Sequence, residues 1–158
     1  MFSYFKFSML KKLFIVILFL LFITVSACNN DNQTPEQHIR FVINEIEAGI
    51  ENRSLSKVID HISEDYHDHK SRTKKDIQRY VQLHILRNQS ITILSKVQSI
   101  DIEGDLASVE LSAAAVARGA NDNDALTVKA DTHKASLVFK QKSGNWKVIS
   151  ASWDDFIL

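Results

Sequence analysis

Cysteine is almost absent from this sequence, with Cys28 alone among 158 residues. A single cysteine excludes an intramolecular disulfide, so no covalent crosslink within the chain stabilises the fold. Internal repeats and low-complexity segments are also absent, and composition changes only at Cys28. The longest apolar run, residues 13–23, is shorter than the roughly 20 residues that a membrane-spanning helix needs.

The first 27 residues are organised as a secretory signal peptide. Lys6, Lys11 and Lys12 precede the apolar run at 13–23, and small residues follow it. Residues 25–28, with the sequence Val-Ser-Ala-Cys, closely resemble the lipobox of bacterial lipoproteins. The resemblance implies that Cys28 is lipidated and becomes the first mature residue. Two alternatives stay open, a cleaved signal that leaves a free thiol and an uncleaved anchor.

We therefore expect a lipoprotein signal peptide at 1–27, a lipidated tether at 28–33 and one domain at 34–158. The mature chain of 158 minus 27 residues is long enough for one hydrophobic core. Its 16 basic and 19 acidic residues leave a net charge of −3, which does not attract nucleic acid. Asn29 after the cysteine resembles lipoproteins sent to the outer membrane of enteric-type bacteria. The predicted location is the bacterial cell envelope, lipid-anchored, and the periplasmic side of the outer membrane in a Gram-negative cell.

Three helices are predicted after the tether. Thr34 and Gln37 have the spacing of a capping box, and Pro35 stands at the first helical position. Glu47 and Glu51 are expected to face outward. The inward stripes, each typical of a core-facing helix, are Ile39, Val42, Ile43, Ile46 and Ile50, then Leu55, Val58, Ile59 and Ile62, then Ile77, Tyr80, Val81 and Ile85.

Apolar residues alternate from Ile91 to Trp153, which predicts an antiparallel sheet. The alternation changes parity near Ser99 and again at 131–134, and each change predicts a β-bulge that bends the sheet. The predicted fold class is α+β, with three N-terminal helices packed on a strongly curved antiparallel sheet of about four to five strands.

This order of elements resembles the nuclear transport factor 2-like (NTF2-like) superfamily, whose cystatin-like cone is shared with ketosteroid isomerase, scytalone dehydratase and polyketide-cyclase relatives. The resemblance spans Thr34 to Trp153 and includes Ser-Glu-Asp-Tyr at 63–66 and Gly-Asn-Trp-Lys-Val at 144–148. It implies that 34–158 is an NTF2-like domain with a pocket between the concave sheet and the helices. It also implies a homodimer through the outer face of the sheet.

Enzymes of the resembled superfamily move protons with acids, histidines and tyrosines that line the cone. The candidates for such a role here are Asp65, Tyr66, His84, Asp131 and His133. No catalytic motif of those enzymes can be placed on this sequence residue by residue. The alternative is that these are buried polar side chains bonded to backbone groups.

Candidate ligand-binding residues lie on the third helix and the last strand. Tyr80 and His84 fall on or beside the inward stripe of that helix. Trp146 and Trp153 stand at opposite ends of the last strand, and their odd spacing would place them on opposite faces of a regular strand. Core packing is the alternative role for each tryptophan.

Histidines are concentrated between the second and third helices. His61, His67 and His69, with Asp65 and Asp68 among them, offer nitrogen and oxygen ligands to a metal such as zinc. Their spacing does not complete a known tetrahedral set, and a solvated loop explains the composition equally well. A pH-sensitive patch is a further interpretation.

Three functions are compatible with these features, and none requires a cofactor. The first is an envelope lipoprotein whose domain binds a small apolar ligand or an envelope protein without catalysis. The second is an isomerase, dehydratase or cyclase-like enzyme with a carboxylate or histidine as general base. The third is a structural dimer whose cone is filled by its own side chains.

Overall fold

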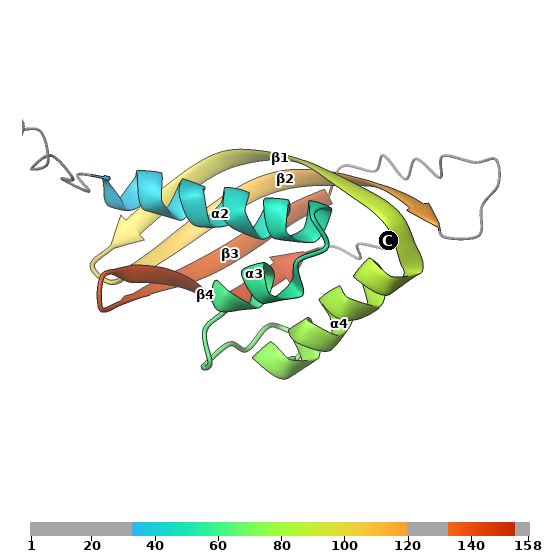
Figure 1. Cartoon of the computed structure of the whole chain (residues 1–158). Coiled ribbons are helices and arrows are strands. Elements are labelled where there is room, and N and C mark those ends of the chain that lie inside the picture. The colour runs from blue at the N-terminus through green and yellow to red at the C-terminus, as the bar shows by residue number, and fades with distance from the viewer. Residues whose placement is uncertain (1–32, 120–132, 154–158) are drawn as a thin grey trace, which may run out of the picture. The chain divides into compact units, whose positions relative to one another are not determined.

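The structure, a computed structural model, describes residues 33–119 and 133–153. Within them, three helices lie on one side of a four-stranded antiparallel sheet (Figure 1), which confirms the predicted fold class. None of the helices in these ranges is long and apolar enough to span a membrane. The elements are α2 (Pro35–Glu51), α3 (Leu55–Asp60), α4 (Lys74–Arg87), β1 (Asn88–Glu103), β2 (Leu106–Gly119), β3 (His133–Lys142) and β4 (Asn145–Trp153).

Helices α2 and α4 begin at capping residues. The Thr34 N–H donates to Gln37 Oε1 at 2.9 Å, and the Gln37 N–H donates to the Thr34 hydroxyl at 3.2 Å. This is the reciprocal capping box that the sequence predicts. At the start of α4, the Thr73 N–H donates to the Asp76 carboxylate at 3.0 Å. These bonds determine the residue at which each helix starts.

The sheet has the strand order β1-β2-β3-β4, with neighbouring strands paired in sequence. The turns before β2 and β4 contain Gly104 and Gly144, whose φ angles of 63° and 81° favour glycine. A register shift between Val97 and Ser99 confirms the bulge predicted near Ser99. Figure 1 shows β1 bending strongly along its length.

A second bulge lies in β4. Val138 pairs with Ser150 and Phe139 pairs with Val148, so Ile149 is the extra residue. The sequence instead placed the second bulge at 131–134. Only the last two residues of that segment are described, and they pair with β2 in regular register.

Aliphatic and aromatic side chains fill the space between α2 and the sheet. Ile39 and Val42 of α2 are at most 1% exposed and belong to one core cluster with residues of all but the first strand. Members of that cluster on the sheet include Ala107, Val109, Leu111, Phe139, Trp146, Val148 and Ala151. The stripe predicted from helical spacing is therefore the core face of α2.

Both outer strands of the sheet have partners along their free edges. At β1, Glu51 Oε1 accepts from the Ile93 N–H at 2.7 Å, and Glu47 accepts from the Ser95 hydroxyl. The two glutamates therefore contact β1, whereas the sequence suggested that they face outward. Such contacts satisfy backbone groups that would otherwise be available to another chain.

The edge of β4 is bonded to the segment that follows α3. The Ser63 N–H donates to the Val148 carbonyl at 2.9 Å, and the Val148 N–H donates to the His61 carbonyl at 3.0 Å. Further along, the His67 N–H donates to the Ile149 carbonyl at 3.0 Å. The segment between α3 and α4 is thereby fixed against the strand that carries both tryptophans.

Candidate functional site

The two tryptophans of β4 have different surroundings although both face the helices. The extra residue at Ile149 cancels the odd spacing, so Trp146 and Trp153 lie on the same face. This differs from the opposite faces expected for a regular strand. Trp146 is 2% exposed within the core, whereas Trp153 is half-buried and packs at its margin.

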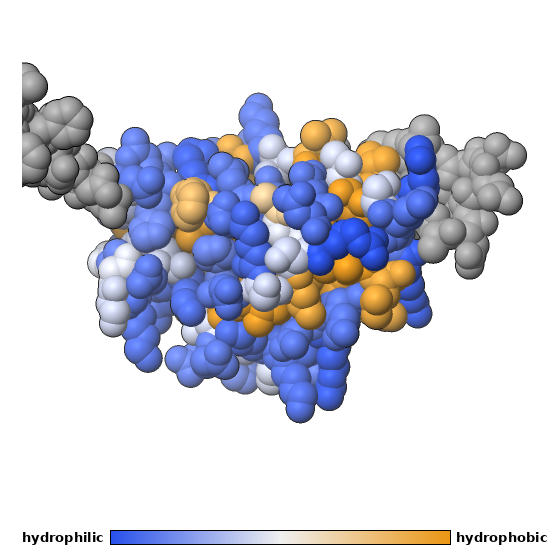
Figure 2. Space-filling model, in the orientation of Figure 1, coloured by the Kyte–Doolittle hydropathy of each residue, from blue (hydrophilic) through white to orange (hydrophobic). Residues whose placement is uncertain are grey.

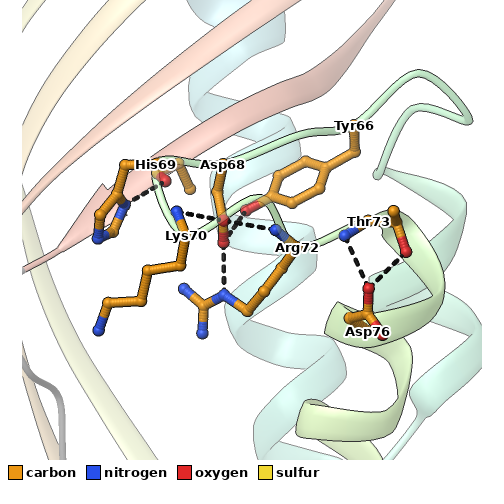
Figure 3. Close-up of polar contacts among 8 residues, drawn as sticks. Tyr66, Asp68, His69, Lys70, Arg72, Thr73 and Asp76 are labelled. Carbon is orange, nitrogen blue, oxygen red and sulfur yellow. Dashed lines mark hydrogen bonds and ion pairs between the residues drawn. The ribbon is translucent and has the colours of Figure 1, made fainter.

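Next to Trp153, the loop between α3 and α4 folds around the carboxylate of Asp68. One oxygen accepts the N–H groups of Lys70 and Arg72, each at 2.9 Å. The other accepts from Arg72 Nε at 2.6 Å and lies 3.5 Å from the Tyr66 hydroxyl (Figure 3). The Asp68 side chain is fully buried. These bonds close a tight turn that includes Ser71 with a φ of 57°.

Asp68 is ionised and fully engaged by its donors. Burial alone would raise the pKa of its carboxyl, but the hydrogen bonds from Arg72 and Lys70 outweigh burial and the pKa lies below its usual range. Burial, followed by the charge of Asp68, raises the pKa of the Tyr66 hydroxyl, so this group stays protonated. Tyr66 is 1% exposed and acts as a buried donor. The pair is arranged to hold a charge in place and not to exchange protons.

The guanidinium group of Arg72 lies between the loop and two aromatic rings. Its central carbon is 4.3 Å from the centroid of the Trp153 ring and 5.8 Å from that of Tyr80. Both distances are within the range of a cation–π contact. Its Nη2 atom is buried and has no hydrogen-bond partner. A buried donor without a partner costs about 1–3 kcal/mol, so this atom is of functional interest.

Tyr80 and His84 lie one turn apart on α4, with ring centroids 4.4 Å apart. Both are half-buried. Burial lowers the pKa of His84, and the charge of Arg87 lowers it further, so the imidazole is neutral at pH 7. Its Nδ1 atom is buried without a hydrogen-bond partner. Burial raises the pKa of Tyr80, while Arg72 and Lys70 oppose that shift.

No family model and no curated protein matches the sequence. Solved structures do match the shape of the domain. An NTF2-like protein of Cytophaga hutchinsonii aligns with a TM-score of 0.58 at 16% identity, over 78% of this chain and 100% of that one. A domain of Nostoc punctiforme with a cystatin-like fold aligns with a TM-score of 0.61 at 12% identity, over 80% and 81%. The domain has the NTF2-like fold.

The NTF2-like domain also aligns with part of a longer protein. The structure of Bdellovibrio bacteriovorus Bd1075 gives a TM-score of 0.63 at 12% identity, over 77% of this chain. The chain spans 40% of the length of that protein. At such identities the likeness concerns the fold, and the chemistry of the site has to be argued from its own residues.

Three of the four predicted ligand-binding residues meet at one end of the NTF2-like domain. Arg72 contacts the rings of Tyr80 and Trp153, and Tyr80 contacts His84. Trp146 lies in the core at the other end of β4. We refer to Asp68, Arg72, Tyr80, His84 and Trp153 as the arginine site.

The remaining proton-transfer candidates lie elsewhere or are engaged. Asp65 is exposed. His133 begins β3 opposite Ala113, on the helix-covered face of the sheet, and is half-buried. Asp131 lies outside the described residues. Of the candidates that the structure describes, only His84 belongs to the arginine site.

The three histidines considered as metal ligands have different surroundings. His61 follows the end of α3 and is half-buried, and burial lowers its pKa. His67 is exposed, with Nδ1 3.2 Å from the Asp65 carbonyl. The ring of His69 stands edge-on to Trp153 at 6.3 Å, and its Nδ1 is 3.5 Å from the Ala151 carbonyl. In the ranges 33–119 and 133–153, no three His, Cys, Asp or Glu side chains are grouped as metal ligands would be.

Sequence reasoning missed Arg72 entirely and considered Asp68 only as a metal ligand. Their spacing of four residues is the only local signal that could have paired them. In a non-helical loop such spacing does not imply contact, because no regular period fixes the side-chain directions. The turn that joins them depends on hydrogen bonds from the loop backbone to the carboxylate of Asp68.

Proposed function

We propose that the protein is a lipoprotein of the bacterial cell envelope whose NTF2-like domain binds a small apolar ligand without catalysing its conversion. The observation that carries the binding role is the arginine site. There, the guanidinium of Arg72 lies against the rings of Trp153 and Tyr80, and Tyr80 contacts His84. Two buried nitrogen atoms of this group, Arg72 Nη2 and His84 Nδ1, have no hydrogen-bond partner. Ring faces with a few convergent polar atoms are typical of ligand sites.

The protonation states at the site favour binding over proton transfer. A general base needs a free lone pair and a pKa near the working pH. Asp68 has neither, because donors occupy both oxygens and the pKa of its carboxyl is lowered. His84 is neutral, but no acceptor orients its ring through Nδ1. Catalytic histidines are normally oriented by such a third group.

The surface near α4 supports a ligand with an apolar body. Leu83 and Leu86 of α4 are 42% and 66% exposed, although neighbouring apolar side chains of the helix are buried. Figure 2 shows hydrophobic surface gathered between α2 and α4, while the N-terminal half of α2 is mostly hydrophilic. Exposed apolar surface next to half-buried polar groups is typical of a binding region.

The binding role is tested by what copurifies with the protein. The full-length chain is purified in detergent and extracted with organic solvent, and the masses in the extract are measured. We expect an apolar compound in near-stoichiometric amount, and a strong reduction in the Tyr80→Ala and His84→Ala variants. His67→Ala, which changes an exposed histidine of the nearby loop, is the matched control. An empty site in the parent chain, or equal retention in all variants, would contradict the proposal.

The lipid anchor rests on residues 25–28 and is tested separately. Cys28→Ala removes the thiol that would carry the lipid. We expect this variant to lose labelling by radioactive palmitate and to leave the membrane fraction. Cys28→Ala protein that still takes up palmitate would refute the lipoprotein assignment but would not affect the binding role.

A further inference from the structure

Three cations act on the rings of the arginine site. Tyr80 experiences two cations, Arg72 and Lys70, and His84 experiences the cation of Arg87. The carboxylate that faces Arg72 is Asp68, which is already bonded to Nε at 2.6 Å.

Asp68 leaves the edge formed by the two Nη atoms of Arg72 unbound. A guanidinium presents several N–H donors in a planar fork, and Asp68 uses Nε. Nη2 is buried without a partner, and the ring of Trp153 lies 4.3 Å from the central carbon. Asp68 and Trp153 thus hold the guanidinium in one orientation. A fork held in this way binds a planar anion with little further loss of side-chain freedom.

We propose that the ligand carries a carboxylate, which the Nη edge of Arg72 binds, and an apolar body that lies against the rings of Tyr80 and His84. This inference rests on the proposed binding function and adds the charge and chemical class of the ligand. A carboxylate matches the planar fork through two parallel N–H···O bonds. It also supplies an acceptor for Nη2, a buried donor that lacks one.

Three probes of one shape and different charge test the inference. They are 2-naphthoate, the neutral 2-naphthamide and the cationic 2-naphthylmethylammonium. Their dissociation constants for the full-length chain are measured by equilibrium dialysis at one ionic strength, with detergent on both sides of the membrane. We expect naphthoate to bind about tenfold more tightly than the amide, a difference of about 1.4 kcal/mol. We expect the cation to bind most weakly.

Two arginine variants test whether Arg72 causes the preference for naphthoate over the amide. Arg72→Lys keeps a positive charge beside Asp68 but removes the Nη edge, so the naphthoate-to-amide ratio should fall to about one or two. Arg79→Lys makes the same replacement at an exposed position of α4 and should keep the parent ratio. His84→Ala should weaken all three probes by a similar factor, because it removes a ring and no charge at pH 7. Circular dichroism verifies the fold of each variant.

The outcomes separate this inference from the proposed function. If the amide or the cation binds as tightly as naphthoate, the carboxylate is wrong and the binding role remains. If no probe binds at all, both proposals are wrong. An equal loss of preference in Arg79→Lys would show a general charge effect and overturn the role of Arg72. Should Arg72→Lys not fold, the comparison of the three probes on the parent chain still decides the charge of the ligand.

Discussion

The two ends of β4 carry the same residue type in different environments. At the start of the strand, Trp146 is 2% exposed within a core that includes Ile39, Val109 and Phe139. At its end, Trp153 is half-buried and faces the guanidinium of Arg72. The difference comes from what covers the strand, because α2 supplies aliphatic side chains to the core around Trp146, whereas the loop before α4 supplies His69 and Arg72 to Trp153. The first end is part of the hydrophobic core, and the second carries the arginine site.

The largest expected effect concerns the tryptophans themselves. Trp146→Ala should lower the free energy of unfolding by about 3–5 kcal/mol, because it leaves a large cavity in a closed core. Trp153→Ala should cost less than half as much, since its ring is partly solvated already. Urea denaturation followed by far-ultraviolet circular dichroism measures both values. Equal losses would show that the two ends are packed alike.

A smaller effect is expected at Asp68. Asp68→Asn keeps the size of the side chain but removes the charge that Arg72 and two backbone N–H groups bind. Losing hydrogen bonds to a charged group costs about 1.5–3 kcal/mol. Because folding lowers the pKa of this carboxyl, its contribution is present above the unfolded pKa of about 3.9 and is lost as the pH falls through the lower folded value.

In Asp68→Asn, the free energy of unfolding should therefore depend less on pH below about pH 4 than in the parent. Urea midpoints measured from pH 7 to pH 2.5 should decrease more steeply in the parent than in Asp68→Asn. Asp65→Asn, which changes an exposed aspartate of the same loop, is the control and should follow the parent. Parallel curves for the parent and Asp68→Asn would show that the Asp68–Arg72 contact does not contribute to stability.

Two alanines on the helix-covered face of β2 allow the packing at the two ends of the sheet to be compared directly. Ala107, opposite Phe139, is 2% exposed, whereas Ala113, opposite His133, is half-buried. Ala107→Val should destabilise the fold by about 1–3 kcal/mol through overpacking. Ala113→Val should change the free energy of unfolding by less than about 0.5 kcal/mol. Thermal unfolding in matched buffers measures both changes. A larger loss of stability in Ala113→Val than in Ala107→Val would show that the side chains are packed more tightly around Ala113, contrary to this prediction.

The smallest effect is the pH dependence from His84. Folding lowers the pKa of this imidazole, so the unfolded chain binds the proton more readily. Stability should therefore fall as the pH drops through the unfolded pKa of about 6.5. His84→Gln should reduce the loss of stability between pH 7.5 and pH 5.5, while His67→Gln should match the parent. If His84→Gln loses as much stability between pH 7.5 and pH 5.5 as the parent, His84 does not cause the effect. His61, whose pKa is also lowered by burial, would then account for it.

The regular elements were predictable because each has a period. The stripe on α2, the capping box at Thr34 and the bulge near Ser99 follow from spacing alone. The bulge at Ile149 was not predictable, because Val148, Ile149, Ser150 and Ala151 contain no break that identifies the extra residue. For that reason the face of Trp153 was predicted incorrectly for this strand.

The arginine site was predictable only in part. Tyr80 and His84 could be found because a helix places residues four apart on one face. Asp68 and Arg72 meet through a loop whose shape depends on side-chain bonds to its own backbone, for which a sequence offers no repeating signal. Asp131, the remaining candidate, falls outside the described residues.

The attachment of the loop between α3 and α4 to β4 has a consequence for redesigning this end of the domain. Three main-chain hydrogen bonds, at Ser63, Val148 and His67, fix the segment to β4, and the carboxylate of Asp68 shapes the turn that follows. Substitutions among its exposed positions can therefore accumulate while the backbone keeps its path beside Trp153. The exposed side chains beside Trp153 can thus be exchanged in this short segment without altering a helix or a strand.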